Sequence, residues 1–189
     1  MSNPRNQTSL SPAAGPGRRS FLLGAAASVT AGMAAPDHAR QNTVPAPPDP
    51  LRAPDRITVF GEDRSTAIGL TRSGDRWQAR DIEVTTSLRK GRNGSERAVS
   101  VTASATRLTR VRLRWHGSFP SGCRYLGDHW ERSYGDLEWR GLAGERQMPW
   151  YFLARHGGAT HGYGVKIGAP SICSWQADAG GITLWLDVS

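Results

Sequence analysis

Leu108–Trp115 reads LTRVRLRW and alternates strictly between apolar and polar or basic side chains. Val111, Leu113 and Trp115 fall on one face of an extended chain, and the arginines at 110, 112 and 114 fall on the other. Successive side chains of a β-strand point to opposite faces, so this alternation predicts a half-buried antiparallel strand. Such a strand places its apolar face on a core and its arginines in solvent.

Short segments of the same kind follow one another from residue 56 onward, and none shows a convincing helical period. Arg92-Asn93-Gly94 predicts a hairpin, since Asn-Gly supplies the positive φ that a tight turn needs. The sequence therefore predicts an all-β fold, an antiparallel β-sandwich, with Trp115 and Trp150 in its core. The expected strands are Ile57–Phe60, Trp77–Thr86, Ala98–Ala105, Leu108–Trp115, Trp150–His156, Gly162–Lys166, Ile172–Ala177 and Ile182–Val188.

Residues 1–39 have the pattern of a twin-arginine export signal. Arg18 and Arg19 precede Phe21 and Leu22, and a short, weakly apolar run of small residues follows. This run is shorter than the roughly 20 apolar residues that span a bilayer, so no permanent membrane anchor is expected. We expect export by the twin-arginine route, cleavage of the signal, and a periplasmic or extracellular product.

The remaining chain divides into a linker and a domain. Residues 40–55 are rich in proline, which predicts an extended, semi-rigid linker. Residues 56–189 are then expected to form one β-sandwich domain of ordinary size. The chain stops at Leu184–Ser189, which has the pattern of a strand with no polar tail. We therefore expect the domain to be incomplete at its carboxyl end and to continue in a longer protein.

The chain is strongly basic, with a formal net charge of +8 at pH 7. Basic residues concentrate between Leu88 and Trp115, where Glu96 is the single acid, and we assign them to one hairpin. A basic surface can bind the phosphates of nucleic acid, but export removes the protein from most nucleic acid, so this partner is not expected. A solvated strand face is the plainest interpretation. The alternative is a docking face for another domain or subunit, which leaves a homo-oligomer open.

The cysteines and histidines indicate no catalytic or metal chemistry. Cys123 and Cys173 are the two cysteines, and they show no metal-ligand spacing together with the histidines. Export favours a disulfide, whereas folding before export in a reducing cytoplasm opposes one, so their pairing stays open. The sequence contains no glycine-rich phosphate loop and no nucleophile elbow. We expect neither a metal nor a cofactor.

Leu126–Trp139 reads LGDHWERSYGDLEW and interleaves aromatic rings with carboxylates around two glycines. It fits neither a helical nor a strand period, and each glycine precedes an aspartate, which predicts a turn-rich loop. Tryptophan rings cover the apolar face of a sugar, and carboxylates accept hydrogen bonds from its hydroxyls. Asp128, Trp130, Asp136 and Trp139 are therefore candidate substrate-binding residues. The alternative is that the tryptophans fill a core while the acids are solvated or pair with neighbouring arginines.

Four stretches, taken in order, resemble the amino-terminal β-sandwich region of bacterial α-galactosidases of the glycoside hydrolase family 36 type. They are LGDHWERSYGDLEWRG at 126–141, MPWYFLA at 148–154, THGYGVK at 160–166 and WQADAGGITLWLDV at 175–188. The resemblance is strongest from residue 126 onward and thin before it. It implies a β-supersandwich that precedes a (β/α)₈ barrel, and the barrel carries both catalytic aspartates. A barrel needs on the order of 250 residues, so this chain is expected to hold no catalytic residue and to be inactive alone.

In that family, loops of the sandwich reach over the barrel mouth and contact the terminal galactose. The resemblance therefore assigns this role to the aspartates and tryptophans of residues 126–139, with an α-galactoside oligosaccharide and the missing barrel as partners. The expected function is the amino-terminal domain of an exported, α-galactosidase-like glycoside hydrolase. Two alternatives from other classes remain: a free-standing carbohydrate-binding β-sandwich, and a structural or interaction domain.

Overall fold

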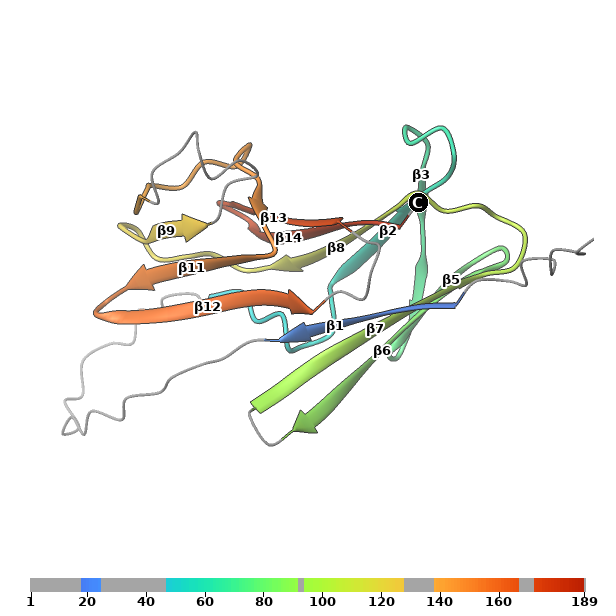
Figure 1. Cartoon of the computed structure of the whole chain (residues 1–189), viewed down its shortest axis with the longest axis horizontal. Coiled ribbons are helices and arrows are strands. Elements are labelled where there is room, and N and C mark those ends of the chain that lie inside the picture. Colours follow the sequence, from blue (N-terminus) through green and yellow to red (C-terminus); the bar gives the residue numbers. More distant parts are fainter. Residues whose placement is uncertain (1–17, 25–46, 92–93, 128–137, 167–171, 189) are drawn as a thin grey trace, which may run out of the picture.

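The computed structural model describes residues 18–24, 47–91, 94–127, 138–166 and 172–188. These residues form strands and their connections, with no helix among them. The strands make two antiparallel sheets that are not closed into a barrel and that pack as layers (Figure 1). The prediction of an all-β antiparallel sandwich is confirmed.

The eight-stranded sheet has the order β4-β5-β6-β7-β1-β12-β11-β9. Its strands are β4 (Thr71–Ser73), β5 (Arg76–Ala79), β6 (Ile82–Gly91), β7 (Gly94–Ala103), β1 (Arg18–Gly24), β12 (Ala159–Lys166), β11 (Tyr151–His156) and β9 (Arg124–Gly127). The predicted hairpin around Asn93-Gly94 is confirmed as the β6–β7 pair, which closes with Gly91 opposite Gly94.

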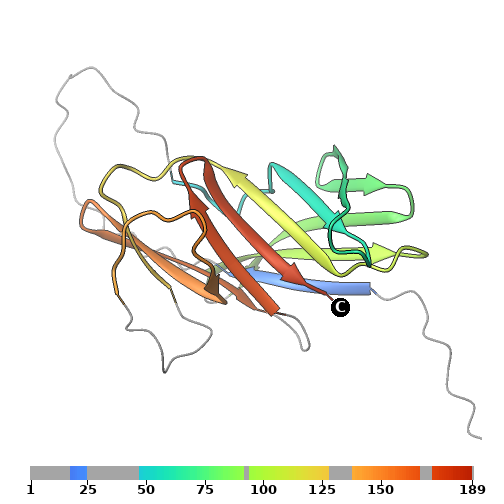
Figure 2. The same ribbon diagram turned by 90° about the horizontal axis from the view of Figure 1, so that it is seen from above.

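The six-stranded sheet has the order β10-β13-β14-β8-β2-β3. Figure 2 shows the red, yellow and teal strands β13, β14, β8 and β2 side by side in this sheet. Its strands are β10 (Met148–Pro149), β13 (Ile172–Asp178), β14 (Gly181–Asp187), β8 (Arg110–His116), β2 (Arg56–Phe60) and β3 (Ala67–Gly69).

Strand β8 lies between β14 and β2 in the six-stranded sheet and pairs antiparallel with both. It is the half-buried antiparallel strand that its alternating sequence predicts. Val111, Leu113 and Trp115 point to the core and are fully buried, each with 0% exposure. The indole N–H of Trp115 donates to the carbonyl oxygen of Arg52 at 2.9 Å, so burial leaves no unpaired donor on this ring. The prediction that Trp115 belongs to the core is confirmed.

Aromatic rings from both sheets join the two layers. Phe152 and Tyr163 of the eight-stranded sheet stack with centroids 4.5 Å apart. Phe152 also meets Trp175 of the six-stranded sheet edge-on at 5.7 Å, and Trp175 lies 6.1 Å from Trp115. Such pairs add about 0.5–1.5 kcal/mol each to the free energy gained from area burial. The rings therefore fix how the sheets face each other.

A glycine at the start of β14 sets the close approach of this strand to β8. Gly181 has φ of +140°, a conformation that side chains rarely adopt. A Cβ added there would overlap the carbonyl oxygen of Trp115 on the neighbouring strand. The Gly180-Gly181 turn thus lets β14 register with β8 along its whole length, with Trp185 opposite Arg112.

The prediction that Trp150 is a core residue is wrong, because its side chain is 39% exposed. Trp150 lies between β10 and β11 and has φ of +56°, outside the pleated conformation on which side-chain alternation depends. Its carbonyl oxygen still accepts hydrogen bonds from the Trp175 indole at 3.2 Å and from the Val165 amide at 3.1 Å. The backbone of Trp150 therefore joins the core while the ring turns outward.

The expected strand Trp77–Thr86 is two strands, because Arg80, at φ of +55°, forms a turn between β5 and β6. The basic residues between Leu88 and Trp115 also do not share one hairpin. Those of β6 and β7 lie in the eight-stranded sheet, and those of β8 lie in the six-stranded sheet. The chain crosses from one sheet to the other between β7 and β8, which divides the predicted basic surface.

Strand β1 comes from the segment that the sequence assigns to an export signal. It pairs with β7 on one side and β12 on the other, with Leu22 opposite both Ala98 and Lys166. No direct pairing links β7 and β12. The export signal and the domain boundary at Arg56 stay predictions. In this structure Arg18–Gly24 completes the eight-stranded sheet, so cleavage of the predicted signal would remove β1 from that sheet.

We expect a chain that lacks residues 1–39 to melt at a lower temperature than the full chain. Removing β1 exposes the unpaired backbone groups of β7 and β12 along one gap in the sheet. Thermal denaturation followed by circular dichroism is the measurement, and a chain that lacks only residues 1–17 is the matched control. Equal melting temperatures for both truncated chains would contradict a structural role for β1.

Candidate functional site

The six-stranded sheet turns one face to the core and the other to solvent. Alternation along β2, β8, β14 and β13 places polar and basic side chains on the outer face, here called the Trp185 face. Pairing of these strands aligns the side chains in cross-strand rows. The central row is Thr58, Arg112, Trp185 and Ser174; the flanking rows are Arg56, Arg114, Thr183 and Gln176, and Phe60, Arg110, Asp187 and Ile172.

The half-buried indole of Trp185 forms the floor of this face. Its N–H donates to the side-chain oxygen of Gln176 at 2.6 Å. The guanidinium carbons of Arg110 and Arg112 lie 5.5 and 5.4 Å from the ring centroid, and the Phe60 ring lies 5.9 Å away. These contacts are within the range of cation–π and aromatic attraction, so they hold the ring in place against the sheet.

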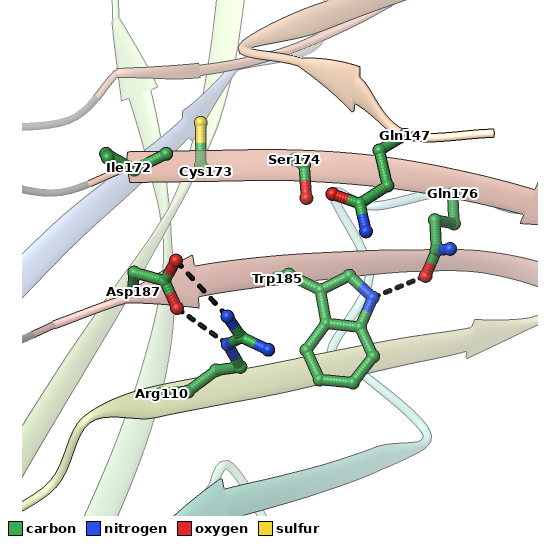
Figure 3. Close-up of a pocket in the computed structure, with 8 residues that line it drawn as sticks. All are labelled: Arg110, Gln147, Ile172, Cys173, Ser174, Gln176, Trp185 and Asp187. Atoms are coloured by element: carbon green, nitrogen blue, oxygen red, sulfur yellow. Dashed lines mark hydrogen bonds and ion pairs between the residues drawn. The ribbon is translucent and has the colours of Figure 1, made fainter. Parts of the chain in front are cut away.

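A hollow of about 210 Å³ opens on one side of Trp185 and is called the Asp187 hollow. Figure 3 shows the Trp185 ring between the Arg110–Asp187 pair and Gln176, with Gln147 and Ser174 beside it. Arg110 donates from Nε to Asp187 Oδ1 at 2.6 Å and from Nη2 to Oδ2 at 3.4 Å. A fixed ring is thus bordered by directed hydrogen-bond donors and acceptors.

A second hollow, of about 380 Å³, opens on the other side of Trp185 and is called the Arg112 hollow. Arg56, Arg112, Arg114 and His116 line it together with Asp178, Thr183, Gln176 and Trp185. Arg114 pairs with Asp178 through two hydrogen bonds of 2.6 and 2.7 Å, and it also donates to the Thr183 hydroxyl at 2.9 Å. The hydrogen bond from Arg114 is the main reason that the pKa of Asp178 lies below its usual range.

The Trp185 face combines what a sugar requires from a protein. An aromatic ring covers the apolar C–H face of a pyranose, while amides, guanidiniums and carboxylates bind its hydroxyls in fixed directions. Here Gln176, Arg110 and Asp187 supply those polar groups around one ring.

The candidate residues of the segment 126–139 are only partly described. Asp128, Trp130 and Asp136 lie outside the described residues. Trp139 is half-buried, and the guanidinium of Arg155 lies 5.5 Å from its ring centroid.

The two ends of this segment come together at β9. The Tyr125 amide donates to the Arg140 carbonyl at 2.8 Å, and the Arg140 amide donates back at 2.9 Å. This bridge extends from β9, which is an edge strand of the eight-stranded sheet, so Trp139 does not join the Trp185 face.

Sequence reasoning missed the Trp185 face, although its signal was present. In WQADAGGITLWLDV the polar residues Gln176 and Asp178 recur at period two before the Gly180-Gly181 turn. Trp185 and Asp187 recur at the same period after it, opposite to buried leucines. Two such strands joined by a tight turn must present these residues on one face.

The remaining predicted sites are placed as follows. The export-signal residues Arg18, Arg19, Phe21 and Leu22 lie in β1, whose backbone pairs with β7 and β12. Cys123 and Cys173 are both buried, free thiols, which answers the open question of their pairing. Burial raises the pKa of Cys173 to about 11.

Within the described part of the chain, no group of three or more histidine, cysteine, aspartate or glutamate side chains is arranged to hold a metal ion. The same residues include no helix that is long and apolar enough to cross a membrane. Comparisons with protein-family models, with curated proteins and with solved structures each found no match to this chain. The side chains of the site are therefore the basis for inferring function.

We expect Arg114→Met to raise the pKa of Asp178 toward the ordinary aspartate value of about 3.9, because Arg114 supplies its main hydrogen bond. Titration of the carboxyl ¹³C signal by NMR measures this, with Arg56→Met as a control that leaves the pair intact. A folded-state pKa below the unfolded value stabilises the fold above about pH 4, and this contribution is lost as the pH falls through the folded pKa. The difference in melting temperature between Arg56→Met, which keeps the pair, and Arg114→Met, which lacks it, should therefore shrink in acid. An unchanged pKa in Arg114→Met would contradict the assignment.

Proposed function

We propose that this chain is a carbohydrate-binding β-sandwich domain, the amino-terminal part of an exported, α-galactosidase-like glycoside hydrolase. The observation that carries the binding role is the Trp185 ring, held by Gln176 and bordered by Arg110 and Asp187 in an open hollow. A ring used only for packing needs no such border of directed polar groups.

The orientation of the polar groups supports sugar binding in particular. Asp187 accepts hydrogen bonds, Arg110 donates them, and the Gln147 amide can do both. Vicinal hydroxyls of a pyranose are each both donor and acceptor, so they can satisfy such a mixed set while the ring stacks on Trp185. A purely apolar ligand could cover the Trp185 ring but would make no use of these donors and acceptors.

The enzyme family and its substrate enter this proposal through the resemblance in sequence. The two-sheet fold is of the class that the resemblance implies. The fourth similar stretch covers the end of β13 and all of β14, which contribute Gln176, Trp185 and Asp187 to the Trp185 face. In this proposal a terminal α-galactoside is cleaved by aspartates of a barrel, and the present chain binds and positions the oligosaccharide. Asp128, Trp130, Asp136 and Trp139 remain proposed contacts to the terminal galactose.

The chain alone is accordingly proposed to bind sugar without hydrolysing it. Retaining hydrolysis needs two carboxyl groups held about 5 Å apart across the scissile bond. On the Trp185 face the carboxylates of Asp178 and Asp187 are each engaged by an arginine. Their pairing keeps them as hydrogen-bond acceptors and leaves neither as a free nucleophile or acid.

We expect Trp185→Ala to weaken binding of methyl α-galactoside at least tenfold, which corresponds to about 1.4 kcal/mol. The physical reason is loss of the stacking surface. Isothermal titration calorimetry measures the dissociation constant, and thermal melting verifies that the variant is folded. Trp150→Ala removes an exposed tryptophan that lines neither hollow and should bind as the parent does.

Trp139→Ala distinguishes the Trp185 face from the segment 126–139. If the isolated chain binds through the Trp185 face, Trp139→Ala retains the parent affinity. Loss of binding in Trp139→Ala, with normal binding in folded Trp185→Ala, would move the site to the segment and contradict the proposal.

A further inference from the structure

Two of the four arginines on the Trp185 face have no carboxylate partner among the described residues. Arg110 pairs with Asp187, and Arg114 pairs with Asp178. Arg112 donates only to the Thr58 hydroxyl, at 3.3 Å, and otherwise contacts the rings of Trp185 and Phe60. Arg56 makes no ion pair with any described residue. The Arg112 hollow therefore carries positive charge that the described residues do not neutralise.

Strand pairing brings these like charges together. Arg56 lies directly opposite Arg114, and Arg112 is two residues from Arg114 on the same face of β8. Burial lowers the pKa of Arg112, and the neighbouring charges of Arg56 and Arg114 lower it further. Like charges held side by side are destabilising unless an anion lies between them.

The protein's own acid cannot fill this role. Asp178 is the one carboxylate that lines the Arg112 hollow, and both of its oxygens are already bonded to Arg114. A solvated strand face would leave the guanidiniums free in water. Arg112 is instead partly buried and held over Trp185, a fixed position that suits an arginine which binds an anion through its planar fork.

We infer that the Arg112 hollow binds the anionic group of an acidic sugar, a carboxylate or a sulfate ester. Trp185 and Gln176 line both hollows, so a sugar stacked on this ring can direct a charged substituent toward Arg56 and Arg112. The sugar part of this inference rests on the proposed function. The anion part rests on the arginines alone.

Titration calorimetry with galactose, galacturonic acid and galactose 6-sulfate tests the inference, and the two acids distinguish the source of the charge. At least one acidic sugar should bind tenfold or more tightly than galactose, and added salt should reduce this preference. Arg56→Met should abolish the preference while the affinity for galactose stays unchanged, because the exposed Arg56 does not line the Asp187 hollow, where the proposed neutral-sugar contacts lie. Arg112→Met is a second variant that removes the other arginine of this hollow that has no described carboxylate partner, and it should abolish the preference for the acidic sugar as well.

Arg89→Met is the matched control, since it removes the same charge from an exposed position on the other sheet. A preference lost equally in Arg89→Met and Arg56→Met would indicate only the overall charge of the protein and would overturn the inference. Equal affinity for all three sugars would also overturn the inference, but it would not contradict the proposed binding of a neutral sugar. If inorganic sulfate binds in a manner that depends on Arg56 and none of the three sugars binds, the result would support the anion site and contradict the proposed function.

Discussion

Alternation of side chains along β8 and β14 links the core of this domain to its candidate site. Leu113 and Leu184 face each other in the core, and the next pair along the same two strands, Arg112 and Trp185, faces solvent. A slip of one residue in the pairing would bury the arginines and expose the leucines. The register that the core requires is therefore the register that assembles the Trp185 face, and neither can change without the other.

The aromatic core behind the sheet gives this face its rigidity. Trp175 packs against Trp115 in its own sheet and against Phe152 from the opposite sheet. Truncating a fully buried tryptophan typically costs about 3–5 kcal/mol. A strand that is fixed on its inner side holds its outer side chains in fixed rows. Binding sites on such a strand lose little conformational freedom when a ligand arrives.

The sequence predicts most of the strands and the burial of Trp115, because those depend on local alternation. It does not predict the exposure of Trp150, because a tryptophan is not a residue type that predicts the positive φ found at this position, and this φ turns the ring outward. The site was missed for a different reason: Trp185 becomes a platform only when β8 places Arg110 and Arg112 beside it, and the choice of neighbouring strand is made by tertiary packing. The same choice divided the basic residues between two sheets.

The central claim is that Trp185 is the ring on which a sugar binds. Each tryptophan has one indole N–H, so ¹H–¹⁵N NMR can follow all of them separately during a titration with methyl α-galactoside. The account predicts that the Trp185 signal, identified by its loss in Trp185→Phe, shifts on binding, because its N–H contacts Gln176 at the edge of both hollows. The signals of the buried Trp115 and Trp175 indoles should not shift. A titration that shifts the Trp139 signal and leaves Trp185 unchanged would contradict it.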